Sequence, residues 1–327
     1  MRRRSVLGLI GGTAAPIWAQ RALAQSFNRI LRVGLVSSTN PRSAPQYAAI
    51  DQRLAQLGYI EGQNLTLEFI LLHGDVERYR EAMDELVRRK VDIIIAFGQE
   101  RALKAAIAAT TAIPIVMVAL DYDPLALGYA TSLARPTGNL TGLYVQQIEL
   151  AAKRVQLVRE AFPERKTAIA FWDAASADQW RAAQGAALEQ SLSLVGVELR
   201  QRPYDYDMAL ALAPLDHRGV VVVMNAPTFF IDRERLAQFA LRHRIASFFA
   251  WRELVVAGGL ISYGPNFVRI ARRAAELVDR IARGARPSDL PIERPVTFEL
   301  VINLQTASAL NLTIPPTLLA RADEVIE

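Results

Sequence analysis

The sequence predicts an α/β protein of two lobes, each built on a doubly wound parallel sheet. Short apolar segments of strand length alternate along the chain with segments whose apolar residues recur at helical spacing. Some strand candidates, such as residues 91–97 (VDIIIAF), are almost continuously apolar and β-branched, as parallel strands covered on both faces are. The alternation begins again after the turn at residues 136–139, so we expect two similar lobes.

Four strands are predicted in the first half of the chain, at residues 31–36, 64–70, 91–97 and 114–120. A helix between the first two strands contains Tyr47, Ile50 and Leu54 at helical spacing and should stop at Gly58. A second helix passes through residues 79–87, and an alanine-rich third helix runs to residue 109. Ligands of such sheets bind at the carboxyl ends of the strands, so the loops that follow these strands are the expected place for a site.

The second half repeats this order after a strand at residues 140–145. Its predicted strands are residues 167–172, 197–202, 219–224 and 246–250, and its predicted helices are residues 148–161, 177–194, 206–212 and 232–243. The two series therefore have the same strand–helix alternation.

Residues 250–265 (AWRELVVAGGLISYGP) separate this second series from the clearest amphipathic helix of the chain, residues 266–284. Asn266 is its expected N-cap and Gly284 its expected C-terminal residue. A linker and a strand at residues 297–303 follow. The chain thus has material for three crossings between the lobes, near residues 138–145, 260–265 and 294–303. Three crossings would form a hinge between lobes that close on a ligand.

These crossings divide the chain into discontinuous lobes. We expect lobe 1 to contain residues 28–144 plus 264–292, and lobe 2 to contain residues 145–263 plus 296–327, with the C-terminal segment packing near the hinge.

The N-terminus resembles an export signal. Arg2, Arg3 and Arg4 precede an apolar run too short for a membrane span, and Ala22 and Ala24 supply a small-x-small cleavage pattern. We expect residues 1–24 to be removed and the product to be periplasmic, without membrane insertion. The paired arginines fit a twin-arginine signal, and a general secretory signal fits equally well.

Removal of this segment changes the charge of the protein. The 38 basic residues fall to 34 because the segment holds four arginines and no acid, which leaves about one net positive charge against 33 acidic residues. This near-neutral balance disfavours nucleic acid as a partner. The chain has no cysteine, which excludes disulfides, thiolate metal sites and a lipidated cysteine.

The usual catalytic signatures are absent from the sequence. It contains no Gly-x-Gly-x-x-Gly, P-loop, Gly-x-Ser-x-Gly or His-Glu-x-x-His motif. His73, His217 and His243 are scattered, and surface or cap roles suit them better than metal binding or general-base catalysis. We therefore expect no enzymatic activity, no metal and no cofactor.

The residues just beyond the predicted strand ends are the candidates for ligand binding. They are Ser37, Ser38, Thr39, Gln99 and Asp121 in the first lobe, Trp172, Asp173, Asn225, Trp251 and Arg252 in the second, and Tyr263 at the second crossing. Hydroxyls and N–H groups at helix starts can hold a carboxylate, an acid can hold an ammonium, and aromatic faces can sandwich an apolar side chain. This mixture suits a zwitterion better than a phosphate.

Each candidate also has an ordinary structural reading. Asp123, before Pro124, is better explained as a turn residue than as half of a catalytic carboxylate pair. Asp121 is open between a turn residue and a ligand for a cationic group. A tryptophan after a strand can pack into the core as well as stack on a ligand, which applies to Trp172 and Trp251.

Several segments together resemble one known family. They are VRRKVDIIIAFG, TAIPIV, LARPTGNLTG, ELAAKR, the glycine-containing stretch that ends in GGLISYGP and, most specifically, FELVINLQTASALNLTIPPTLLARADEVIE. From about Leu31 to the C-terminus the chain is similar to the ABC transporter substrate-binding proteins of the tryptophan/tyrosine-binding type. This resemblance implies a type I periplasmic-binding-protein fold with a ligand in the cleft between two lobes.

The resemblance also implies partners, namely an ABC permease with its ATPase. It does not carry the ligand over directly, because Gln99-Glu100 stands where the family has a small or hydroxyl residue, and Trp172-Asp173 where it often has Asn-Pro. We expect a monomeric, extracytoplasmic solute-binding component of an ABC importer, with an aromatic or aliphatic amino acid as ligand. A ligand-sensing module of a membrane receptor with the same fold is the alternative, and an enzyme is a weaker one.

Overall fold

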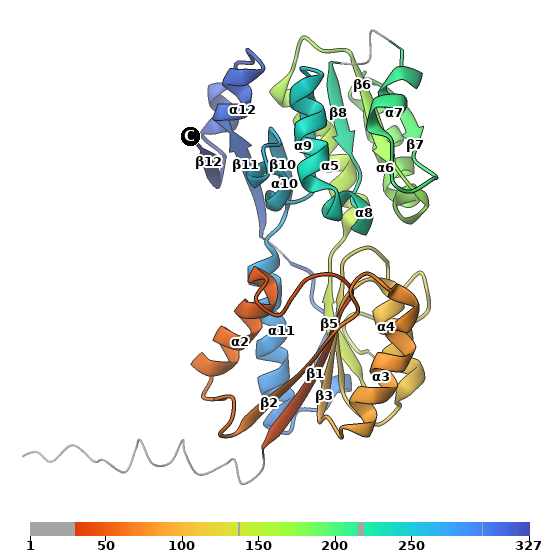
Figure 1. Ribbon diagram of the computed structural model, residues 1–327, viewed down its shortest axis with the longest axis vertical. Helices are drawn as coiled ribbons and strands as arrows, with labels where there is room; N and C mark the ends of the chain where they lie inside the picture. Colours follow the sequence, from red (N-terminus) through yellow and green to blue (C-terminus); the bar gives the residue numbers. More distant parts are fainter. Residues whose placement is uncertain (1–29, 137, 215–218, 296) are drawn as a thin grey trace, which may run out of the picture.

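Residues 30–136, 138–214, 219–295 and 297–327 are described by the computed structural model, and their strands form two separate sheets (Figure 1). Sheet A has the order β2-β1-β3-β4-β5, and sheet B has the order β12-β11-β10-β9-β8-β6-β7. Neighbouring strands run parallel except β10 and β11, which are antiparallel. The predicted class of two α/β lobes is therefore confirmed. The expected export signal, residues 1–24, lies outside the described residues.

Sheet A forms the centre of lobe 1. Its strands are β1 (Leu31–Ser37), β2 (Leu65–Leu71), β3 (Ile93–Gly98), β4 (Ile115–Ala119) and β5 (Leu140–Tyr144). Its main helices are α2 (Pro45–Gln56), α3 (Tyr79–Arg88), α4 (Glu100–Ala109) and α11 (Phe267–Ala282). Strand β3 explains the layering: Ile93 and Ile95 pack with α2 and α11, whereas Ile94 and Ala96 pack with α3 and α4. A strand buried on both faces in this way needs an apolar residue at every position.

Sheet B forms the centre of lobe 2. Its strands are β6 (Thr167–Trp172), β7 (Ser193–Glu198), β8 (Val220–Val223), β9 (Ala246–Phe249), β10 (Ile261–Pro265), β11 (Phe298–Asn303) and β12 (Glu324–Ile326). One face is covered by α5 (Gln147–Ala161), α6 (Ala177–Glu189), α12 (Leu304–Ala309) and α13 (Pro316–Leu319). The other face is covered by α7 (Tyr206–Leu212), α8 (Pro227–Ile231), α9 (Arg233–Arg242) and α10 (Arg252–Val256). Short 3-10 helices occur at Val76–Arg78, Ala174–Ser176 and Pro287–Asp289.

The chain passes between the lobes three times, as Figure 1 shows. It leaves sheet A after β5 to begin α5, returns from β10 into α11, and crosses again before β11. Gly264 and Pro265, which the sequence assigns to lobe 1, instead pair with Glu299 and Phe298 in sheet B. The predicted boundary between lobe 2 and lobe 1, after residue 263, was therefore two residues too early, because β10 continues to Pro265 along its antiparallel partner β11.

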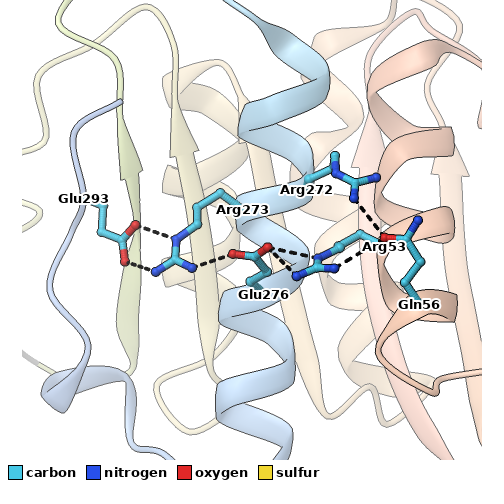
Figure 2. Close-up of polar contacts among 6 residues, drawn as sticks. All are labelled: Arg53, Gln56, Arg272, Arg273, Glu276 and Glu293. Carbon is cyan, nitrogen blue, oxygen red and sulfur yellow. Dashed lines mark hydrogen bonds and ion pairs between the residues drawn. The ribbon is translucent and has the colours of Figure 1, made fainter. Parts of the chain in front are cut away.

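Helix α11 is tied to the third crossing and to α2 by a chain of charged side chains (Figure 2). Arg273 donates two hydrogen bonds of 2.7 Å to the carboxylate of Glu293 and a third of 2.5 Å to Glu276. Arg53 of α2 contacts Glu276 from the other side at 2.8 Å. Glu293 also joins β5 through its backbone, which accepts from Tyr144 N at 2.9 Å. The ion pairs therefore connect α2, α11 and a hinge segment on one side of lobe 1.

The predicted ends of α11 are confirmed. The side chain of Asn266 accepts a hydrogen bond from the N–H of Arg269 at 2.9 Å, as an N-cap does. Gly284 has a φ of +99° and donates to the carbonyl of Ile281, which ends the helix. Gly58, with a φ of +96°, ends α2 in the same manner.

One strand of lobe 2 was predicted at the wrong place. The sequence suggested a helix through residues 177–194 and a strand at 197–202, but α6 ends at Glu189 and β7 spans Ser193–Glu198. The helix stops because Ser191 takes a left-handed conformation, with a φ of +50°. Gly196 then allows the ring of Trp180 to lie against β7, since a Cβ there would be 2.4 Å from that ring. Strand β12 and the short helices α8 and α10 were not predicted.

Candidate functional site

A cleft between the lobes contains two adjoining cavities, with volumes of about 100 Å³ and about 720 Å³. We call the smaller one the aromatic cavity, because its lining includes Tyr47, Tyr79, Phe97, Phe230, Trp251 and Phe267. We call the larger one the polar cavity, because its lining includes Glu100, Arg101, Asp123, Tyr144, Gln147, Asp178, Gln179 and Arg202. Ser38, Thr39, Gln99, Asp121, Pro227 and Ile231 line both. The two cavities are therefore neighbouring parts of one site.

The cleft forms where the carboxyl ends of parallel strands from the two sheets face one another. Ser38 follows β1, Gln99 follows β3 and Asp121 follows β4 in lobe 1. Asn225 follows β8 and Trp251 follows β9 in lobe 2. This is the position at which doubly wound sheets bind ligands.

Trp251 forms part of the wall of the aromatic cavity. Its ring stacks on that of Phe267, with centroids 4.0 Å apart and planes 19° from parallel. The rings of Phe230 and Phe267 meet edge to face, with centroids 5.6 Å apart. Tyr47 and Phe97 form a second edge-to-face pair at 5.6 Å. Aromatic faces from both lobes therefore surround a space that suits a planar apolar group.

Asn225 fixes the orientation of the Trp251 ring. The indole N–H of Trp251 donates to Oδ1 of Asn225. The backbone of Asn225 is in turn held by the amide of Gln179, which accepts from its N–H at 2.9 Å and donates to its carbonyl at 2.8 Å. Trp251 and Asn225 are 3% and 6% exposed, so this wall is buried and pre-formed.

Asp121 is the unusual charged group of the cleft. Its side chain is partly exposed to the cavities, but its Oδ1 atom is shielded from solvent and has no hydrogen-bond partner within the described part of the chain. The pKa of Asp121 is raised from 3.8 to about 7, chiefly by burial; backbone hydrogen bonds oppose this rise, and the nearby charges of Glu100 and Asp173 add to it. A cationic group beside Asp121 would supply the missing partner and stabilise the carboxylate.

The remaining acids of the polar cavity already have partners. Asp123 accepts from the N–H groups of Leu125 and Ala126 at 2.8 and 3.1 Å, which confirms it as a turn residue. Asp178 pairs with Arg181 at 2.7 Å. Glu100 accepts from the hydroxyl of Tyr129 at 2.5 Å. Asp121 thus differs from its acidic neighbours.

Residues 39–326 match the model of a family described as ABC transporter substrate binding protein. The chain belongs to this family. The match covers most of the chain and includes all three crossings and most of both lobes, but it begins after β1.

The chain is also similar in sequence to a curated protein and in fold to solved structures. A curated tyrosine-binding protein of Clostridioides difficile (strain R20291) is 24% identical over 262 residues, which cover 79% of this chain and 74% of the relative. The solved structure of an ABC domain from Streptococcus pneumoniae in complex with L-Trp is 21% identical with a TM-score of 0.79, and the alignment covers 91% of this chain and all of that chain. A conserved domain protein from Vibrio cholerae gives a TM-score of 0.81 at 22% identity with the same coverage.

Six of the predicted site residues of this substrate-binding protein line the cavities, namely Ser38, Thr39, Gln99, Asp121, Asn225 and Trp251. Gln99 is the N-cap of α4, in extended conformation after Gly98, whose φ is +103°. The structure thus brings together candidates from the strand ends of both lobes.

Ser37 and Trp172 do not line either cavity. Ser37 is buried, and its hydroxyl donates to the carbonyl of Asn40 at 2.7 Å to close the loop after β1. Trp172 stacks on Trp180 of α6, with centroids 6.1 Å apart, and packs against the core. Of the two roles that the sequence left open for Trp172, packing into the core and stacking on a ligand, its position is that of a core residue.

Asp173, Tyr263 and Arg252 also lie outside the lining. Asp173 accepts from the hydroxyls of Tyr204 and Ser176, both at 2.9 Å, at the start of a 3-10 helix. Tyr263 packs against the cores of both lobes at the second crossing. Arg252, expected to face the cleft beside Trp251, instead forms an ion pair with Glu324 at 2.5 Å.

The sequence did not single out Tyr47, Phe97, Phe230 or Phe267 as site residues. Tyr47 lies at a helical core position and Phe97 at a buried strand position, so their patterns are those of core residues. Phe97 directly precedes the glycine that ends β3, which is the one signal that could have marked it.

Among the described ranges, no group of three or more His, Asp or Glu side chains could hold a metal ion. His73 is exposed, and His243 caps α9 and contacts Asp207 at 2.5 Å. His217 lies outside the described residues. No helix in the part of the chain that the structure describes has the length and apolar character of a membrane span.

Proposed function

We propose that this protein is the extracytoplasmic solute-binding component of an ABC importer and that it binds an amino acid with an aromatic side chain. Membership of the substrate-binding family supports the role, and relatives named for tyrosine binding or solved with L-Trp support the ligand class. Delivery would be to a membrane permease and its ATPase, with the protein acting as a monomer. Residues 1–24 would direct its export to the periplasm.

Asp121 is the observation that carries the ligand assignment. Its Oδ1 atom has no partner among the residues that the structure describes, and Asp121 lines both cavities, sharing the lining of the aromatic cavity with Trp251 and Phe267. An ammonium group at Asp121 and an aromatic ring in the aromatic cavity satisfy both features with one small molecule. Aliphatic amino acids offer the same ammonium but gain less from the aromatic walls.

Binding would favour approach of the lobes. The cavity walls come from both lobes, so a bound molecule makes its full set of contacts only when the strand ends of sheets A and B face each other closely. The ligand can favour that form only by the difference between its affinities for the closed and open forms. The permease would then recognise the closed surface.

A thermal-shift screen of residues 25–327 with the natural amino acids and small carboxylates tests this function, followed by titration calorimetry of each hit. We expect L-tryptophan and L-tyrosine to raise the melting temperature more than L-leucine does, because ligand binding to the native state stabilises it. A protein stabilised by another class of solute and by no amino acid would overturn the ligand assignment.

A further inference from the structure

A fully buried arginine lies behind the wall of the polar cavity without an acidic partner. Arg154 of α5 is 0% exposed. Its guanidinium donates to Oε1 of Gln147 at 3.3 and 3.4 Å, to the carbonyl of Tyr263 at 3.3 Å and to Oε1 of Gln179 at 3.5 Å. No carboxylate forms an ion pair with it in residues 30–136, 138–214, 219–295 or 297–327.

Arg154 remains a cation in this position. Burial lowers the pKa of Arg154 to about 9, which is still above neutral pH. A buried charge held only by neutral groups is costly, because it loses its hydration and gains no opposite charge. An anion bound nearby would supply the missing opposite charge and offset the cost of burying Arg154.

Gln147 connects this cation to the polar cavity. It is the first residue of α5, 4% exposed, and lines that cavity. The guanidinium of Arg154 has only donors, so the amide of Gln147 must direct its oxygen to Arg154 and keep its N–H groups for another partner. Nε2 of Gln147 is shielded and has no hydrogen-bond partner among the described residues.

Gln147 and Asp121 extend from neighbouring strands. The N–H of Val145, just past β5, donates to the carbonyl of Ala119 at the end of β4 at 2.9 Å. Gln147 lies two residues after Val145, and Asp121 lies two residues after Ala119. A buried donor and a buried acceptor, both unpartnered, therefore belong to adjacent strand ends of one cavity.

We propose that Gln147 binds the carboxylate of the ligand and that Arg154 is a positioning residue, which orients the amide of Gln147 and supplies the opposite charge behind it. This inference rests on the proposed function, in which an amino acid is the ligand. An α-amino acid carries its ammonium and its carboxylate on one carbon atom, so partners on adjacent strand ends suit it. The N-terminus of α5, where Gln147 lies, adds a partial positive charge.

The test compares three probes by titration calorimetry on residues 25–327: L-tryptophan, its carboxamide, and tryptamine, which lacks the carboxylate. We expect the wild-type protein to prefer L-tryptophan to the carboxamide. Gln147→Leu should weaken L-tryptophan by about 10- to 100-fold, the range for losing a hydrogen bond to a charged group, and change tryptamine by less than about 3-fold.

Gln146→Leu is the matched control. Gln146 is the preceding residue, does not line the cavity, and donates to Glu149 at 2.8 Å on the exposed side. We expect it to leave the affinities for all three probes unchanged. Arg154→Met should reproduce the selective loss of L-tryptophan binding. If Arg154→Met does not fold, the comparison of Gln147→Leu with the wild-type protein is sufficient to test the inference.

The outcomes separate the two proposals. A wild-type protein that binds no amino acid would overturn the proposed function. A wild-type protein that binds L-tryptophan and the carboxamide equally, or a Gln147→Leu variant that weakens L-tryptophan and tryptamine to the same extent, would overturn only the carboxylate assignment.

Discussion

Replacement of Asp121 by asparagine should stabilise the ligand-free protein at alkaline pH while weakening ligand binding. A carboxyl with a raised pKa binds its proton more tightly in the folded state than in the unfolded state. The free energy of unfolding of the wild-type protein therefore falls as the pH rises from about 4 to about 7, and the loss persists above that range. Asparagine has a similar shape and no charge, so it removes this pH-dependent loss.

The size of the effect follows from the pKa. The difference between 3.8 and about 7 corresponds to a loss of about 4 kcal/mol for the wild-type protein at pH 8, as an upper value. We expect Asp121→Asn to be more stable than the wild type at pH 8 by about 2 to 4 kcal/mol and nearly equal to it at pH 4.

Urea denaturation at pH 4, 6 and 8 measures this difference. Asp205→Asn is the control, because Asp205 is an exposed N-cap of α7 that asparagine can replace. Equal stability of Asp121→Asn and wild type at both pH 4 and pH 8 would show that burial does not raise the pKa of Asp121 in the folded protein.

Binding should show the opposite dependence on pH. Only the ionised form of Asp121 attracts an ammonium group, so below its pKa of about 7 the affinity of the wild-type protein falls by about tenfold for each pH unit. L-tryptophan should thus bind about 100-fold more weakly at pH 5 than at pH 8. Asp121→Asn should bind it weakly, with the same affinity at both pH values.

Two further predictions concern stability. Gly142→Ala should lower the free energy of unfolding, measured by urea denaturation, by about 3 kcal/mol or more, because Gly142 has a φ of +147° and a Cβ there would lie 2.0 Å from the carbonyl oxygen of Met117. Gly185→Ala, in the open middle of α6, should instead raise it by about 0.5 to 1 kcal/mol. Equal effects of the two substitutions would refute the steric argument. A double-mutant cycle of Arg273→Ala and Glu293→Ala, read by the same method, should give a coupling of about 0.5 to 1 kcal/mol for this partly exposed ion pair, and additive effects would show that it does not hold α11 to the third crossing.

The sequence was sufficient for the fold because local pattern and tertiary position agree over most of the chain. Strand β3 is apolar at each buried position, and the caps of α11 lie at Asn266 and Gly284 as expected. The pattern failed at β7, where Leu192 and Leu194 continue the apolar spacing of α6 beyond its end. There the left-handed conformation of Ser191 overrides the periodicity.

The site was only partly predictable because the spatial order of the strands in a sheet cannot be deduced from their order along the chain. Trp172 and Trp251 both follow a strand, and the sequence treats them alike. β6 lies next to the edge strand β7, whereas β9 lies between β8 and β10, close to the second crossing. Trp251 consequently meets Phe267 from the start of α11, and Trp172 meets Trp180.

Polar partners could not be read from the sequence either. Gln147 and Arg154 looked like ordinary residues of an amphipathic helix, and only the packing of α5 shows that both are buried. Asp121 and Asp123 are likewise two similar acids in one loop. Their difference lies in which of them accepts backbone hydrogen bonds from the turn that follows.

The position of α11 also has a consequence for the order in which the protein can fold. The strands of sheet A are complete once the ribosome has added Tyr144, but α11 covers one face of that sheet and begins only at Phe267. All of lobe 2 from α5 to β10 is synthesised in between. The part of this face that α11 covers therefore stays exposed until late in translation, and the core beneath it closes through contacts between residues far apart in the sequence.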